Sequence, residues 1–257
     1  ACTGAPGPLH WHTANRAKGA SNLAKLAYEF QVAMRKPGLP ASMAMHISMG
    51  QTESRLHSPV ARLRWYEDAA TLAWSGWSGG AGGKLPLLPP DGAHTFVLGT
   101  PGVGKTVFRT FMAVHILQHD PDKECLIVFD RSACENDPVI LVRRSSGRLD
   151  VATTKDGRAV QAAVAQASES KRRVYHLLDV SKGDMNGMGS GAAYSRQFTL
   201  VTSCPHDKVI TAAKEAKKKG GVQTSADRRS RRSGDAAQRT TRARLQPRFM
   251  PLQQSGR

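Results

Sequence analysis

The sequence lacks the features that define several large classes of protein. Its four cysteines, Cys2, Cys125, Cys134 and Cys204, are scattered and form no CxxC pair. This pattern argues against a zinc site or a disulfide framework and favours a reducing compartment. No apolar run approaches the roughly 18 residues that a membrane-crossing helix requires. No signal peptide is recognisable, but the chain begins with Ala1 rather than Met, so a fragment without its leader stays an open alternative.

Acidic residues are also in short supply, and the imbalance is concentrated at one end. The chain has 37 Lys plus Arg against 20 Asp plus Glu, a formal net charge of +17. Residues 208–257 alone carry 14 basic and three acidic residues, a net charge of +11, so the other 207 residues carry only +6. Residues 208–257 also contain few large apolar residues, so this segment can bury too little surface to offset the entropy lost on ordering. We therefore expect a disordered basic tail.

Two basic clusters in this tail, Lys217–Lys219 and Arg228–Arg232, lie about ten residues apart. Such a pair resembles a two-part nuclear-import signal, and it is equally typical of an arm that contacts nucleic-acid phosphates. A solvated tail without a partner is the third interpretation. The tail therefore indicates nucleic acid as a possible partner and the nucleus as a possible location, with the cytoplasm as the alternative.

What the sequence does contain is one complete phosphate-binding motif. Residues 99–106 read GTPGVGKT and fill every fixed position of the pattern GxxxxGK[ST]. Thr95–Leu98 before it is a short β-prone run, and apolar residues recur at helical spacing after it as far as Leu117. Strand, glycine loop and helix form the context in which this pattern binds phosphate. The predicted nucleotide-binding residues are Gly99, Thr100, Pro101, Gly102, Val103, Gly104, Lys105 and Thr106.

Each residue type in this loop has a physical role. Glycines lack a Cβ, so the backbone can curl with its N–H groups directed toward a phosphate. The helix that begins near Lys105 adds its unpaired N–H groups and the positive end of its dipole. Lys105 is the predicted catalytic cation at the β- and γ-phosphates, and Thr106 is a predicted Mg²⁺ ligand. The motif therefore predicts Mg²⁺ and a nucleoside triphosphate, with ATP favoured.

The Mg²⁺ of such a site also needs an acidic residue at the end of a neighbouring strand. Two residues qualify: Asp130 after the run CLIVF, and Asp179 within the run VYHLLDV. We favour Asp179 as the catalytic and metal-associated acid, because an intervening strand and helix place it where such a strand usually comes. Either residue could instead be a strand-terminal Asp that caps a turn. Val180 occupies the position where many ATPases have a Glu that polarises water, so slow or absent hydrolysis is expected.

The rest of the chain predicts a layered α/β fold. Downstream of the loop we expect helices at 105–119 and 157–170, strands at 125–129, 173–180 and 198–203, and a hairpin of 139–143 with 149–153. Strands that alternate with helices predict a P-loop NTPase-like three-layer fold with a mostly parallel sheet. We assign it to residues 91–207 and the basic tail to 208–257.

Residues 1–90 are predicted to form a poorly defined, irregular N-terminal region. Short helices are expected at 21–35 and 59–74, followed by a linker rich in Gly and Pro. Three of the chain's four tryptophans, Trp65, Trp74 and Trp77, lie just before that linker. They could cover or stack on an adenine base, but packing in a helical layer is the favoured interpretation.

The segments FVLGTPGVGKTVF, VYHLLDV and FTLVTSCPH resemble the P-loop region of the retrotransposon hot spot proteins of trypanosomes. The related P-loop segment of oomycete Crinkler effectors is similar. The resemblance covers Thr95 to Lys208. It implies that Lys105 and Thr106 serve phosphate and Mg²⁺, that Asp179 is the acidic strand end, and that Ser203 lies near the γ-phosphate. It also implies a nuclear or chromatin-associated setting, and a nucleotide domain that is incomplete in this chain.

Two other functions stay open. Ser181–Asp184 mimics the guanine-reading element [NT]KxD of a GTPase, although no DxxG lies between the phosphate loop and strand 173–180. A non-catalytic nucleic-acid-binding or effector protein with a degenerate loop is the second alternative. The basic tail and the missing Glu favour that alternative, whereas the intact Lys105–Thr106 pair argues against it. No membrane partner is expected.

Overall fold

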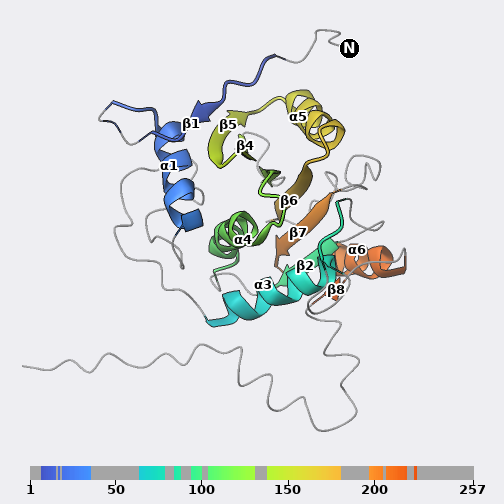
Figure 1. Ribbon diagram of the computed structural model, residues 1–257. Coiled ribbons are helices and arrows are strands. Elements are labelled where there is room, and N and C mark those ends of the chain that lie inside the picture. The colour runs from blue at the N-terminus through green and yellow to red at the C-terminus, as the bar shows by residue number, and fades with distance from the viewer. Residues whose placement is uncertain are drawn as a thin grey trace, which may run out of the picture.

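A computed structural model describes residues 7–15, 17, 19–35, 64–78, 84–87, 94–99, 104–130, 138–180, 197–204, 207–218 and 223–224. These residues form a mixed α/β structure in which helices cover both faces of an eight-stranded sheet (Figure 1). The strand order is β1-β5-β4-β3-β6-β7-β2-β8. The parallel part of the sheet consists of β3 (Cys125–Asp130), β6 (Arg173–Val180), β7 (Phe198–Ser203), β2 (His94–Leu98) and β8 (Gln223–Thr224).

An antiparallel hairpin extends the sheet beyond β3. Strands β4 (Val139–Ser145) and β5 (Arg148–Thr154) pair with each other, and β4 pairs with β3. Ser146 and Gly147 between them have φ angles of 49° and 78°, the positive values that a tight two-residue turn requires to match the twist of the strands. The predicted hairpin is confirmed, with longer strands. The short strand β1 (His12–Thr13) pairs with β5 at the edge of the sheet.

Three helices pack on one face of the sheet: α1 (Asn22–Arg35), α3 (Arg64–Trp77) and α4 (Lys105–His119). Phe30 of α1 and Met112 of α4 are fully buried in this layer. The ring of Trp77 lies 5.6 Å from the rings of both Tyr175 and Phe198, so Trp77 is a core residue. Because α1 and α3 share this core with the strands, the division expected at residue 90 does not separate two cores.

The opposite face carries α5 (Gly157–Glu169) and α6 (Asp207–Lys218), drawn in yellow and orange in Figure 1. Val209 and Ala213 of α6 are buried against Val180 and Val201. The prediction of a disordered tail is therefore wrong for residues 208–218, because two apolar residues one helical turn apart suffice to dock this stretch on the sheet. The cluster Arg228–Arg232 lies outside the described residues.

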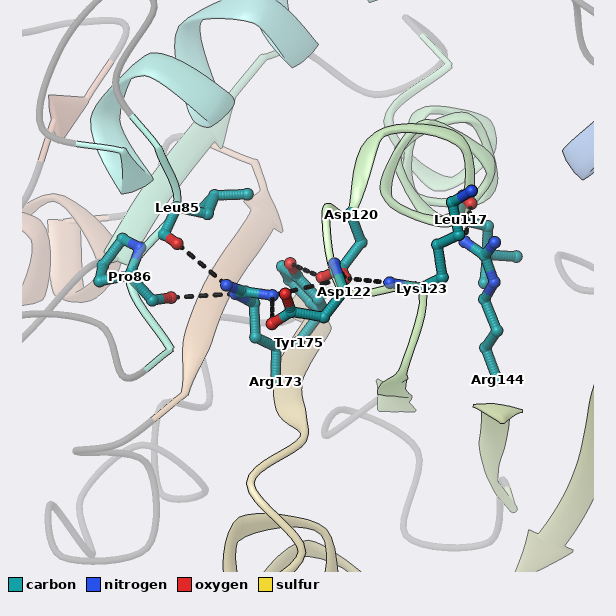
Figure 2. A network of polar contacts seen from close by, with 9 residues as sticks. All are labelled: Leu85, Pro86, Leu117, Asp120, Asp122, Lys123, Arg144, Arg173 and Tyr175. Carbon is teal, nitrogen blue, oxygen red and sulfur yellow. Dashed lines mark hydrogen bonds and ion pairs between the residues drawn. The ribbon is translucent and has the colours of Figure 1, made fainter. Parts of the chain in front are cut away.

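A buried polar network joins the amino-terminal end of β6 to the segments around it (Figure 2). The guanidinium of Arg173, 5% exposed, donates to the carbonyl oxygens of Leu85 and Pro86 at 3.0 Å and pairs with Asp122. Asp120 accepts a 2.5 Å hydrogen bond from the Tyr175 hydroxyl and lies 3.5 Å from Arg173. Burial raises the pKa of Asp120 above its usual value, whereas Tyr175 and Arg173 lower it. This network stabilises the end of the sheet opposite the phosphate motif.

Candidate functional site

The phosphate motif joins β2 to α4 as the sequence predicts, and the structure describes both of its ends. Gly99 follows β2, and its backbone N–H donates to the carbonyl oxygen of Ser203 at 3.2 Å. Gly104 caps the amino terminus of α4 with φ 83° and ψ 19°, a left-handed conformation that favours glycine. Thr100, Pro101, Gly102 and Val103 lie outside the described residues.

The lysine of the motif lies across these two ends. Lys105 is the first residue of α4, and its Nζ donates to the carbonyl oxygen of Gly99 at 2.7 Å. The ammonium group is thus close to the residues that flank the loop on either side. The N–H groups of the first turn of α4, which have no carbonyl partner within the helix, add a partial positive charge at the same place.

Thr106 and Asp179 are brought together from positions 73 residues apart. The hydroxyl of Thr106 donates to Oδ2 of Asp179 at 3.1 Å. Oδ1 of the same carboxylate accepts from the hydroxyl of Thr202 at 3.3 Å. The arrangement unites oxygen donors from α4, β6 and β7, and such hard oxygen ligands are the type that Mg²⁺ prefers.

Asp130, the other acidic candidate, faces away from this group. Its neighbour Phe129 packs on α1, with ring centroids 6.1 Å from those of Phe30, and successive side chains of a strand alternate between faces. The carboxylate of Asp130 accordingly lies on the opposite side, 3.3 Å from Nε2 of His176. Of the two acidic candidates, only Asp179 contacts Thr106.

Ser203 is not the polar residue that approaches Asp179. The Ser203 side chain is buried, and its single hydroxyl proton has two acceptors within reach, the carbonyl oxygens of Val180 at 2.8 Å and Cys204 at 2.9 Å. Thr202, one residue earlier, has the opposite side-chain direction and contacts Asp179. The position of Ser203 near the γ-phosphate, which the resemblance implies, stays a prediction.

Val180 is fully buried among the apolar residues that face α6. A carboxylate there would point away from Thr106, because Val180 and Asp179 alternate between the two faces of β6. The residues that follow β6, 181–196, lie outside the described part of the chain, and the GTPase-like segment Ser181–Asp184 is among them.

The sequence analysis did not identify Arg109, which lies at the centre of this site. Its side chain is 1% exposed. Nη1 donates to the carbonyl oxygens of Asp130 at 2.9 Å and Leu177 at 3.4 Å, and Nη2 lies 3.3 Å from Oδ2 of Asp179. A signal was present, since Arg109 lies within the apolar stretch of α4 three residues after Thr106, the spacing that places two side chains on one face.

Tyr66 of α3 is the second residue that the sequence analysis missed. It is 2% exposed, and its hydroxyl donates to the carbonyl oxygen of Gly104 at 2.9 Å. Its ring lies 5.6 Å from the rings of Phe108 and Phe111 on α4. Burial raises the pKa of Tyr66 to about 12, so the phenol stays protonated and remains a donor. A helix from the N-terminal region therefore contacts the end of the phosphate motif.

No family model matches the chain, and neither a curated protein nor a solved structure matches it. Among the described residues, no group of three or more His, Cys, Asp and Glu side chains could hold a metal ion. Mg²⁺ in phosphate sites commonly uses only one or two carboxylates together with water and substrate oxygens. The described helices include none that is long and apolar enough to cross a membrane.

Proposed function

We propose that the chain binds a nucleoside triphosphate, with ATP favoured, through residues 99–106. The observation that carries this proposal is the contact between the hydroxyl of Thr106 and the carboxylate of Asp179 at 3.1 Å. It joins the end of the motif to an acidic strand end that is distant in sequence. Such a pairing is what a phosphate loop with a metal-associated acid requires.

The oxygen donors of this group fit Mg²⁺. Thr106 would hold the cation through its hydroxyl and Asp179 would hold it through its carboxylate, while Thr202 keeps the carboxylate oriented. When bound, Mg²⁺ would neutralise phosphate charge. Lys105 would exchange its bond to the Gly99 carbonyl for phosphate oxygens, and the first turn of α4 would donate its N–H groups to the same anion.

Binding is better supported than hydrolysis. The position after Asp179, where many ATPases have a Glu that polarises water, holds Val180, which faces away from Thr106, so neither its chemistry nor its direction lets it act as the base. We infer that turnover is slow or absent. We propose accordingly that the chain is a nucleotide-binding protein of the P-loop NTPase class. We further propose that it is related to the retrotransposon hot spot and Crinkler proteins.

We also propose a nuclear location and contact with nucleic acid through the basic tail. The net charge of +11 on residues 208–257 supports both proposals. Since Val209 and Ala213 belong to the core, any such contact would use exposed residues of α6 or residues beyond it.

The test compares two matched substitutions at neighbouring strand ends. Asp179→Asn should remove much of the strengthening that Mg²⁺ gives to ATP binding, because Asp179 contacts Thr106. Asp130→Asn makes the same chemical change on the other face, beside His176, and should leave the Mg²⁺ effect unchanged. Equilibrium binding of a fluorescent ATP analogue, measured with Mg²⁺ and with EDTA, gives the comparison. A loss in Asp130→Asn alone would contradict the proposed site.

A further inference from the structure

The guanidinium of Arg109 occupies the same face of the sheet as the proposed nucleotide site. Arg109 lies one helical turn after Lys105 and Thr106 on α4, so the three side chains share one side of the helix. Its Nη2 and the Thr106 hydroxyl approach the same atom, Oδ2 of Asp179, at 3.3 Å and 3.1 Å. The metal-facing oxygen of the proposed site is therefore already in contact with a cation of the chain.

This cation is fixed in place and permanently charged. The Arg109 side chain is 1% exposed and donates to two backbone carbonyls, those of Asp130 at the end of β3 and Leu177 within β6. Arginine does not lose its proton in proteins, so the charge persists at every working pH. The carbonyl contacts prevent the guanidinium from withdrawing when a ligand enters.

The charge balance of these residues favours an anion over a free divalent cation. Lys105 and Arg109 are both positively charged, and Arg109 lies beside the carboxylate of Asp179. Typical Mg²⁺ sites in proteins supply uncompensated carboxylates. Here the Asp179 carboxylate that contacts Thr106 is paired with Arg109 at 3.3 Å.

We propose that Arg109 supplies part of the positive charge that Mg²⁺ supplies in other phosphate sites, and thereby limits how tightly the chain holds a divalent cation. This inference rests on the proposed function as far as the nucleotide is concerned. The expected effect of Arg109 on the binding of a divalent cation does not require a bound nucleotide. Arg109 thus sets the metal dependence of the site and acts through Asp179 as a positioning residue.

The first experiment measures Mn²⁺ binding to the nucleotide-free full chain by electron paramagnetic resonance. Arg109→Gln keeps an amide donor for the carbonyls but removes the charge, and should tighten Mn²⁺ binding about tenfold or more, the scale expected for a unit and a double charge a few ångströms apart at a wet site. Arg109→Lys keeps the charge and should stay within about threefold of the parent. Equal gains in both variants would overturn the proposal.

A double variant, Arg109→Gln with Asp179→Asn, assigns the cation to this site, because the gain should then disappear. A gain that persists without the carboxylate would place the Mn²⁺ elsewhere and overturn the inference.

The second measurement uses the parent chain and stands even if Arg109→Gln does not fold. The affinity for ATP in EDTA should lie within about tenfold of the affinity in Mg²⁺, since Arg109 replaces part of the cation's charge. A ratio of about a hundredfold or more would refute the role of Arg109. If the parent binds no ATP at all, the proposed function fails, whereas the Mn²⁺ comparison still decides whether Arg109 opposes a cation.

Discussion

The hydrogen bond from Tyr66 to Gly104 gives a prediction whose size follows from the contacts. Tyr66→Phe removes the hydroxyl that donates to the Gly104 carbonyl at 2.9 Å but keeps the ring between Phe108 and Phe111. The carbonyl retains its helical bond from the N–H of Phe108 at 2.9 Å, so no acceptor is left without a partner. The expected loss is therefore that of one neutral hydrogen bond, about 1 kcal/mol of unfolding free energy.

Urea denaturation measures this loss, and for a chain of this size it corresponds to a decrease in Tm of about 2–4 °C. Tyr66→Ala removes the ring as well and should cost about 3–5 kcal/mol. If the bond also positions the peptide at the end of the phosphate motif, the affinity for ATP in Tyr66→Phe should fall by up to about fivefold.

Tyr28→Phe, the same chemical change on α1, is the control for both measurements. A stability loss without any change in affinity would refute the positioning role of Tyr66. An unchanged stability would refute the hydrogen bond itself.

Four further predictions concern stability, turnover and the tail. Burial and His119 lower the pKa of His115 to about 4. Between pH 6.5 and 4, His115 is therefore protonated in the unfolded chain but neutral in the folded chain. Stability should fall by up to about 3 kcal/mol as the pH falls from 6.5 toward 4, and His115→Phe should flatten this slope in urea titrations. Arg173→Met removes the cation beside the buried carboxylate of Asp120 and the donor to the carbonyl oxygens of Leu85 and Pro86, and should cost about 3–5 kcal/mol of unfolding free energy; a loss below about 1 kcal/mol in urea denaturation would contradict the ion pair. The kcat for ATP hydrolysis should be well below the median kcat of enzymes, about 10 per second. A faster steady-state rate would contradict the inference that Val180 makes hydrolysis slow. Truncation after Ser225 keeps α6 and β8 and removes nine arginines, four of them in the cluster Arg228–Arg232; the log–log salt slope of duplex DNA binding should then become less steep by up to about 8, and an unchanged slope would contradict the contact between the tail and nucleic acid.

Most of the secondary structure could be predicted from periodicity, because the elements are strongly patterned. The helices at 22–35, 105–119 and 157–169 and the strands at 94–98, 125–130, 173–180 and 198–203 lie within one residue of the expected bounds. The helix expected at 59–74 is observed at 64–77, with 59–63 outside the described residues. The glycine and proline content of residues 1–90 concealed that α1 and α3 join the main core, since composition does not reveal long-range packing.

The sequence predicted the residue types of the candidate site better than it predicted which side chains contact one another. The motif and the choice of Asp179 over Asp130 followed from the order of elements, and the alternation of side chains along β3 and β6 explains why only one of them meets Thr106. Thr202 was not singled out from the sequence, because its contact with Asp179 depends on the face of β7 that it occupies. Arg109 was missed because a charged residue in a helix is usually solvated, whereas this one is buried.

The measurement that tests the account most directly is a calorimetric titration of the full chain with ATP, and then with GTP, in the presence of Mg²⁺. The parent should bind one nucleotide per chain, and Lys105→Ala should abolish this binding while its urea unfolding midpoint stays close to that of the parent. Lys25→Ala, which removes an exposed lysine from α1, is the matched control and should bind as the parent does. A Lys105→Ala variant that binds nucleotide as tightly as the parent would contradict the central claim.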